Sequence, residues 1–236
     1  APGLMTALGG PEIAGFLHRF AAIVTFGYFA VHLSMLFRDV VLKQQRGFFW
    51  GWRSMTPNLK DVQDLWANLK YFLSLGPRPA LDRWAYWEKF DYLAVFWGVG
   101  MIGVSGLMLW LPDFFTRFLP GWALNAAYII HSDEALLATG FIFLFHFFHT
   151  HLRPESFPMD PVIFTGSMPL HRFKEDRPLE YQRLLDSNTL EQYFVQPPSK
   201  AHIQIAHVFG FVAVALGIWL AVLIFKAIAS GALHLF

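Results

Sequence analysis

The 236-residue chain contains no cysteine and few charged residues. Without cysteine it cannot form a disulfide, bind an iron–sulfur cluster through thiolates, or attach a c-type haem through a C-x-x-C-H motif. Charged residues make up 15% of the sequence, against about 25% in an average soluble domain. The formal net charge is only +1, so a nucleic-acid-binding surface is not expected. Any redox cofactor would need other ligands, and the chain offers ten histidines.

Apolar residues dominate instead, at 55% of the chain, and they are concentrated in four long stretches. A stretch of about 20 apolar residues crosses the ~30 Å hydrocarbon core of a bilayer as a helix, and an open sheet could not satisfy its backbone there. The sequence therefore predicts an all-α fold, a bundle of four transmembrane helices that forms a single transmembrane domain over residues 1–236. The predicted helices cover about 13–40, 90–111, 125–151 and 203–229.

The connections between these helices are unequal. A short turn, 112–122, joins the second and third helices, whereas long loops near 40–91 and 152–202 follow the first and third. Within the first long loop, apolar residues recur at helical spacing, which predicts an amphipathic helix lying at the membrane interface. These residues are Val62, Leu65, Trp66, Leu69, Phe72 and Leu73. The second long loop has seven prolines between Pro154 and Pro198, so we expect it to be irregular and available for contacts with a partner.

The distribution of Lys and Arg predicts an orientation. The two long loops and the adjoining helix ends hold 15 of the 18 basic residues, nine from Arg38 to Lys89 and six from Arg153 to Lys200. By the positive-inside rule, both long loops then face the cytoplasm. We therefore expect a multi-pass protein of the bacterial cytoplasmic membrane with both termini on the periplasmic side.

Histidines occur at similar wide spacings in the first and third predicted helices. His18 and His32 are fourteen residues apart, which on an α-helix gives directions within about 40° and an axial separation of about 21 Å. His131 and His146 are fifteen residues apart, with directions about 60° apart and an axial separation of about 22.5 Å. Each helix thus presents two imidazoles on broadly one face, near opposite surfaces of the membrane.

The two helices run in the same direction because one short hairpin and one long loop separate them. His18 and His131 then lie at the same depth near the outer side, and His32 and His146 lie at the same depth near the inner side. A low-spin haem takes one axial imidazole from each side of its plane. The spacing therefore predicts two b-type haems, the outer one on His18 and His131 and the inner one on His32 and His146.

Other interpretations of these histidines remain open. His149 shares the direction of His131, but its axial distance of about 27 Å overshoots the separation of His18 and His32, so it is the alternative inner ligand. The histidines could also be unrelated buried side chains. The run from His146 to His151 resembles one histidine box of a membrane di-iron desaturase, an enzyme class that needs several such boxes, and the chain has only this one.

Cationic and small residues are placed to accommodate a macrocycle. Arg19 beside His18, and Arg38 and Arg153 near the inner pair, could bind haem propionates or simply anchor helix ends at the headgroups. The second predicted helix carries a series of small residues that would let a flat macrocycle, or another helix, come close. They are Gly98, Gly100, Gly103, Ser105 and Gly106.

Two segments resemble a known family. The run Glu88-Lys-Phe-Asp-Tyr-Leu-Ala-Val-Phe-Trp-Gly, with Gly103-Val-Ser-Gly-Leu-Met-Leu-Trp, resembles the prokaryotic transmembrane cytochrome b superfamily. That group includes formate dehydrogenase gamma subunits and the cytochrome b subunits of thiosulfate reductase and nickel–iron hydrogenase. The stretch from His131 to Glu155 is similar to cytochrome b domains found with periplasmic multihaem cytochromes c. The resemblance covers roughly residues 12–230.

The resemblance implies a membrane subunit that exchanges electrons between quinone and a partner redox subunit. Such a partner would be a multihaem cytochrome c, an iron–sulfur subunit or a molybdopterin subunit. Formate dehydrogenase gamma subunits take haem ligands from three helices, whereas the second helix here has no histidine, so the resemblance implies no particular partner. The alternative from another class is a non-redox membrane anchor for a soluble catalytic subunit.

A quinone site would need proton-exchanging groups at the membrane edge. The inner side offers several such side chains, each of which could equally be a wetted loop residue. They are His151, His202, His207, His171 and Glu155. On the outer side, Asp133 and Glu134 lie beside His131 and could serve the same purpose, or merely favour the helix dipole.

Overall fold

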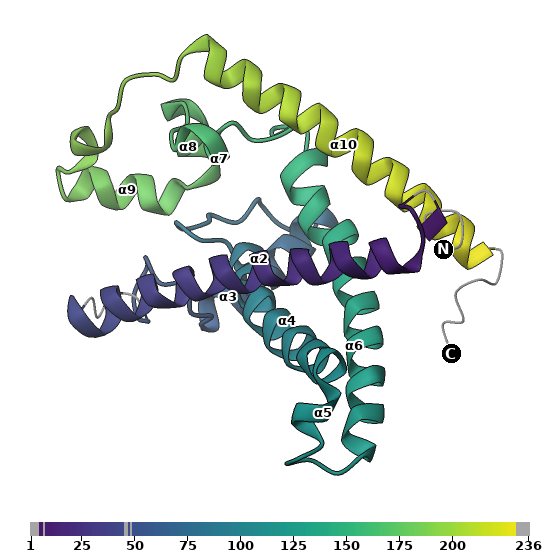
Figure 1. The fold of residues 1–236 in the computed structure, drawn as a ribbon. Coiled ribbons are helices and arrows are strands. Elements are labelled where there is room, and N and C mark those ends of the chain that lie inside the picture. The colour runs from purple at the N-terminus through teal and green to yellow at the C-terminus, as the bar shows by residue number, and fades with distance from the viewer. Residues whose placement is uncertain (1–4, 7, 45–46, 48, 230–236) are drawn as a thin grey trace. The chain divides into compact units, whose positions relative to one another are not determined.

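The structure, a computed structural model, describes residues 5, 6, 8–44, 47 and 49–229. Regular secondary structure in this described part is entirely helical (Figure 1), which confirms the all-α prediction. Four helical stretches are long and apolar enough to cross a membrane: Pro11–Leu42, Tyr86–Trp110, Trp122–Leu152 and Lys200–Lys226. The predicted boundaries agree with these to within four residues. The chain is therefore a multi-pass membrane protein.

Some of the membrane-spanning stretches combine α-helical and π-helical segments. The first comprises α2 (Pro11–Phe37) and the π-helical η1 (Arg38–Leu42), and the second is α4 (Tyr86–Trp110). The third comprises α6 (Trp122–Phe141) followed by two π-helical segments, η3 (Ile142–His146) and η4 (Phe148–Leu152). The fourth lies in α10 (Lys200–Ala229). Short α5 (Pro112–Phe115) occupies the connection after α4.

Large apolar side chains on these helices point outward. Phe16, Val31, Leu144 and Phe225 are each more than half exposed within the chain, as expected for helices surrounded by lipid. Buried positions on the same helices are mostly small, such as Ser105, Ala123 and Ala127. Small residues let helix backbones approach closely where apolar lipid gives no hydrophobic driving force between helices.

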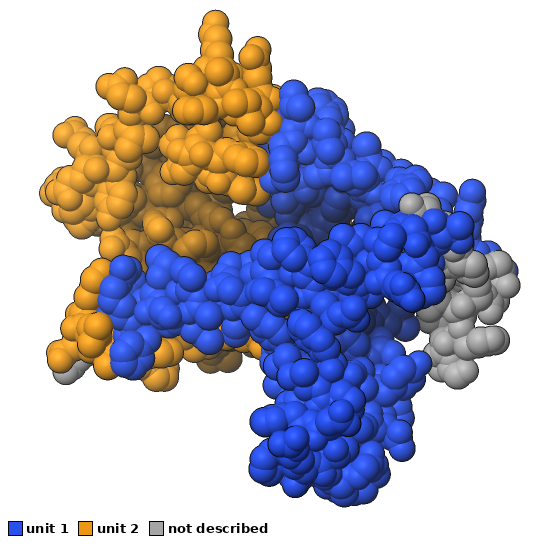
Figure 2. Space-filling model, viewed as in Figure 1, with its two compact units in different colours: residues 1–39, 98–159, 208–236 blue, residues 40–97, 160–207 orange. Residues whose placement is uncertain are grey.

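The chain divides into two compact units (Figure 2). The first contains residues 1–39, 98–159 and 208–236, and the second contains residues 40–97 and 160–207. In the first unit, glycines mark where helices approach one another. A Cβ added to Gly103 of α4 would lie 2.8 Å from the Phe26 ring of α2, and one added to Gly217 of α10 would lie 2.3 Å from the Phe147 ring.

The second unit is built from the two long loops. It includes α3 (Leu59–Phe72), which confirms the helix predicted from apolar spacing. Helix α3 begins with a capping box, in which the Asn58 side chain accepts from the Lys60 amide and the Asp61 carboxylate accepts from the Asn58 amide. Both bonds satisfy backbone donors that the first helical turn leaves unpaired.

The prediction that the second long loop is irregular is wrong. It contains α7 (Val162–Thr165), α8 (Leu170–Asp176), α9 (Pro178–Asp186) and the 3-10 helix η5 (Leu190–Tyr193). Three of its seven prolines stand at the start of a helix, where proline has a suitable φ and needs no hydrogen-bonded amide. Pro169 immediately precedes α8, and Pro178 is in the first turn of α9.

Ion pairs join the two long loops within the second unit. Arg177 donates to both carboxylate oxygens of Glu88, at 2.6 and 2.8 Å, and Arg83 pairs with Glu180 at 2.6 Å. Arg183 pairs with the Asp82 carboxylate. Burial alone would lower the pKa of the Arg177 guanidinium, but its bonds to Glu88 and the nearby acids raise that pKa overall. Residues 82–88 and 177–183 are thus held together by paired charges.

Candidate cofactor site

Two of the predicted histidine ligands face each other in the first unit. The ring centroids of His18, on α2, and His131, on α6, are 6.0 Å apart, and their planes are inclined by 82°. The His18 side chain is exposed and that of His131 half-buried. The residues lie 113 positions apart in the chain, so the meeting of their rings is a product of tertiary structure.

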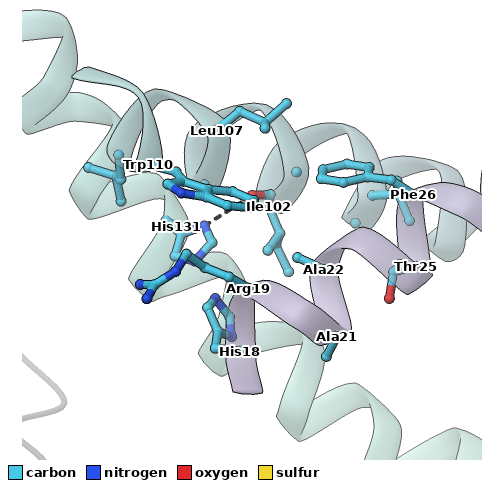
Figure 3. Close-up of a pocket in the computed structure, with 15 residues that line it drawn as sticks. His18, Arg19, Ala21, Ala22, Thr25, Phe26, Ile102, Leu107, Trp110 and His131 are labelled. Atoms are coloured by element: carbon cyan, nitrogen blue, oxygen red, sulfur yellow. Dashed lines mark hydrogen bonds between the residues drawn. The ribbon is translucent and has the colours of Figure 1, made fainter. Parts of the chain in front are cut away.

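A cavity of about 730 Å³ adjoins this pair. That volume falls within the ~300–1,000 Å³ typical of ligand and cofactor sites. Helix α2 contributes His18 and Arg19, helix α4 contributes an apolar wall, and α6 contributes His131 (Figure 3). The remaining lining residues are apolar or small, apart from one threonine. They are Ala21, Ala22, Thr25, Phe26, Gly98, Val99, Ile102, Gly103, Gly106, Leu107, Leu109 and Trp110.

Helix α4 contacts the imidazole of His131 directly. His131 Nδ1 lies 3.0 Å from the carbonyl oxygen of Ile102 and 3.2 Å from Ser105 Oγ. The Ser105 hydroxyl lies 2.6 Å from the carbonyl oxygen of Met101, to which it donates. Sequence reasoning counted Ser105 only as a small residue and missed these bonds. The available signal was its polarity, because residues 93–111 contain no other hydroxyl or charged side chain.

The small residues of α4 have distinct environments. A Cβ added to Gly106 would lie 2.9 Å from Cε1 and 3.3 Å from Nδ1 of His131, whereas one on Gly98 or Gly100 would meet nothing within 4 Å. Gly103 faces Phe26. The predicted close approach therefore occurs at two of the four glycines. At Gly103 the neighbour is the Phe26 ring of α2, and at Gly106 it is the imidazole of His131.

The three arginines considered from sequence have different surroundings. Arg19 lines the same cavity as His18 and His131 (Figure 3). Arg38 Nε lies 2.9 Å from the Asp39 carboxylate, and Arg153 Nε lies 3.5 Å from that of Glu155. Of the three, Arg19 is the arginine that lines the cavity beside the His18–His131 pair.

The second predicted pair involves a helix whose register changes. His32 is on α2, His146 ends π-helical η3, and His149 is in π-helical η4. A π-helix bonds i to i+5 and holds about 4.4 residues per turn, or about 82° per residue. The α-helical angles used above are therefore wrong beyond Phe141. With the π-helical turns included, His146 points within about 30° of His131, and His149 points about 125° away. Ideal π-helical geometry over these segments therefore favours His146 as the inner candidate.

The histidines near the inner side also differ in how exposed their side chains are. The side chain of His146 is exposed, whereas those of His32 and His149 are half-buried. His151 is buried, and its Nδ1 lies 2.9 Å from the carbonyl oxygen of Pro158. Because a carbonyl only accepts, His151 Nδ1 carries the proton of that bond. The sequence allowed His151 to be a loop residue exposed to water, whereas the structure buries its side chain.

Comparisons with known proteins identified no relative of this chain. No protein family, curated protein or solved structure matches the chain.

Proposed function

We propose that this chain is a di-haem b-type cytochrome subunit that transfers electrons between a quinone or quinol pool and a partner redox subunit. The observation that supports it best is the pair of facing imidazoles, His18 and His131, beside a cavity in a membrane-spanning region. An ionisable side chain within a membrane span is costly and usually functional. Two such residues brought together from separate helices make unrelated buried histidines a poor explanation.

The residues fit an axially ligated haem. A metal–imidazole bond is about 2.0 Å long and the ring centre lies about 1.1 Å further, so two imidazoles on opposite sides of one iron have centroids about 6 Å apart. The separation of the His18 and His131 rings is 6.0 Å. Perpendicular ring planes are compatible with this, because each ring can rotate about its own metal–nitrogen bond.

The chain's own residues would bind and shield the cofactor. His18 and His131 would supply the two axial nitrogens, and Arg19 a cation for a propionate. The apolar wall of α4 would exclude water. A haem held in this way supplies one-electron chemistry and has no open coordination position for a substrate. We therefore assign the chain no catalytic residue and an electron-transfer role.

A second haem would use His32 and His146. The register of η3 supports His146 over His149, since it aligns His146 more closely with His131. Arg153 lies near this end of the third span, with Glu155 beside it. The outer and inner sites would then be separated by about 21 Å along α2, so that they would span most of the hydrocarbon core.

Location and partners follow from the same proposal. The protein would lie in the bacterial cytoplasmic membrane with its termini in the periplasm, as the positive-inside rule predicts. A multihaem cytochrome c, an iron–sulfur subunit or a molybdopterin subunit would exchange electrons with it. The resemblance of residues 88–98, 103–110 and 131–155 to transmembrane cytochromes b supports an electron-exchanging partner without selecting one of these three.

Haem quantification and a reduced-minus-oxidised optical spectrum of the purified chain test the proposal. We expect two b haems per chain and the sharp absorption bands of low-spin bis-histidine haem. A colourless protein would instead support the alternative, a non-redox membrane anchor. Fewer than two b haems per chain would overturn the di-haem assignment.

A further inference from the structure

We infer that Ser105 and Gly106 of α4 are positioning residues that fix the tautomer and the orientation of His131. This inference rests on the proposed function, because it concerns an axial ligand of the outer haem. Its evidence is nevertheless separate and consists of contacts between α4 and the imidazole. A ring that is held in place before a cofactor binds loses less conformational freedom on binding.

The tautomer follows from hydrogen-bonding chemistry. Nδ1 of His131 lies 3.0 Å from the Ile102 carbonyl oxygen. A carbonyl oxygen can only accept, so the proton must be on Nδ1. The lone pair of the neutral ring is then on Nε2, the nitrogen available to a metal. A backbone carbonyl thus selects the nitrogen of His131 that can act as ligand.

Ser105 adds a second acceptor on the same side of the ring. Its hydroxyl hydrogen is engaged with the Met101 carbonyl oxygen at 2.6 Å, so a lone pair of Oγ is available to Nδ1–H at 3.2 Å. Ser105 is only 4% exposed, so water has little access to replace it. Acceptors on the distal nitrogen make a histidine ligand more basic and fix its orientation.

Gly106 allows this approach. A methyl group there would lie 2.9 Å from Cε1 of His131, closer than side-chain carbons normally come. The ring would have to turn or withdraw, and its bond to Ile102 would lengthen. Gly100 is on the same helix and has nothing within 4 Å of its added Cβ. It therefore provides a matched control for a glycine-to-alanine change in α4.

The first test compares Ser105→Ala with Ser132→Ala in the haem-loaded full chain. Ser132 is exposed and adjoins His131, but its hydroxyl donates to the Ile129 carbonyl oxygen of its own helix. A less basic ligand stabilises ferric iron less. We therefore expect Ser105→Ala to retain haem and to raise the midpoint potential of one haem, whereas Ser132→Ala leaves both potentials unchanged. Unchanged potentials in both variants would overturn the role of Ser105.

The second test compares Gly106→Ala with Gly100→Ala. We expect Gly106→Ala to weaken haem affinity at one site by about tenfold to a hundredfold, the usual effect of disturbing the support of a ligand. Its ferric electron paramagnetic resonance spectrum should lose or shift one low-spin signal, while Gly100→Ala matches the parent protein. Circular dichroism establishes that both variants remain helical. Equal haem affinity and identical spectra would overturn the role of Gly106.

The two proposals fail in different ways. If the parent chain binds no haem under any loading condition, the proposed function fails. If the parent binds haem and the α4 variants behave like their controls, the proposed function stands and this inference fails.

A different observation carries a second inference: we propose that the apolar face of α3 lies against the lipid surface. Helix α3 is amphipathic, but it buries its polar face and exposes its apolar face. The residues that it buries are Asp61 and Asn68. Its large apolar side chains are exposed and occupy one stripe. They are Leu59, Val62, Leu65, Trp66, Leu69, Phe72 and Leu73, each at least 42% exposed.

The polar face of α3 is attached to the beginning of a membrane span. Asp61 pairs with Lys89 of α4 at 2.9 Å, and these residues are 9% and 6% exposed. Lys89 lies three residues before the charge-free part of α4, which begins at Tyr92 after Asp91, so it lies near the edge of the hydrocarbon region. The pair therefore holds the N-terminus of α3 at that depth. An exposed apolar stripe of this size is unusual on a water-facing surface, and lipid is the occupant already present at this depth.

The absence of cysteine makes this placement directly testable. A spin label is attached to Leu69→Cys on the apolar stripe or to Gln63→Cys on its polar flank, in phosphatidylethanolamine–phosphatidylglycerol vesicles. We expect oxygen to relax the label at 69 more strongly than a water-soluble nickel chelate does, with the opposite order at 63. Two results would overturn the proposal: water accessibility at 69, or protection from both reagents, which would indicate a protein partner on this face.

Discussion

The imidazoles of His18 and His131 face each other with ring centroids 6.0 Å apart, beside a cavity of about 730 Å³. They come from α2 and α6, and α4 supports one of them through the Ile102 carbonyl oxygen. Three membrane-spanning helices thus contribute to one candidate site, and two of them carry the candidate ligands. This arrangement leads to predictions about both haems and about the fold.

Replacing His131 with alanine should remove one haem and leave the other, because each site has its own ligand pair. Haem per chain should fall by about half when measured as the pyridine haemochrome, and His18→Ala should give the same result. His202→Ala is the control, since His202 is exposed near the start of α10. Full haem content in both variants would exclude this pair as ligands.

The inner ligand can be identified by a parallel comparison. Over η3 and η4, ideal π-helical geometry aligns His146 more closely with His131 than it does His149. We therefore expect His146→Ala to lose the second haem and His149→Ala to retain it, again by haem quantification. The opposite result would show that the register in the haem-bound protein differs from the one observed.

Arg19 should tune the outer haem electrostatically. It lines the cavity beside His18, and a cation near a haem favours the more negatively charged, reduced state. The change Arg19→Gln should therefore lower the midpoint potential of one haem in a redox titration. Arg117→Gln is the control, because Arg117 is an exposed residue outside the cavity lining. A potential that does not fall would argue against Arg19 as a cofactor contact.

The ion pair between Asp61 and Lys89 should matter for stability. Lys89→Met would leave Asp61 as an uncompensated buried charge, which typically costs about 3–5 kcal/mol. In Lys60→Met the lost pair, with Asp64, is partly exposed, and such pairs typically contribute about 0–1 kcal/mol. Unfolding followed by tryptophan fluorescence should show a clearly lower midpoint for Lys89→Met alone. Similar midpoints in the two variants would mean that the buried pair is not stabilising.

The sequence by itself determined the four membrane spans and the helix α3. Both depend on local physics: a backbone in hydrocarbon must satisfy its own hydrogen bonds, and apolar spacing identifies a helical face. The spacing of His18, His32, His131 and His146 also predicted which residues to consider as ligands. It could do so for His18, His32 and His131 because the direction of a side chain on a regular α-helix depends only on residue number. His146 lies in η3, where that regular spacing no longer applies.

Tertiary structure decided the rest. Nothing in the sequence of α4 indicates that Gly106 faces an imidazole while Gly100 faces open space, because that depends on how three helices cross. The bond from His131 to Ile102 joins residues 29 positions apart, and a backbone carbonyl has no sequence signature. The π-helical segments after Phe141 and the inward polar face of α3 likewise depend on packing. Local pattern placed the candidate ligands on their helices, and helix packing determined which of them meet and what supports them.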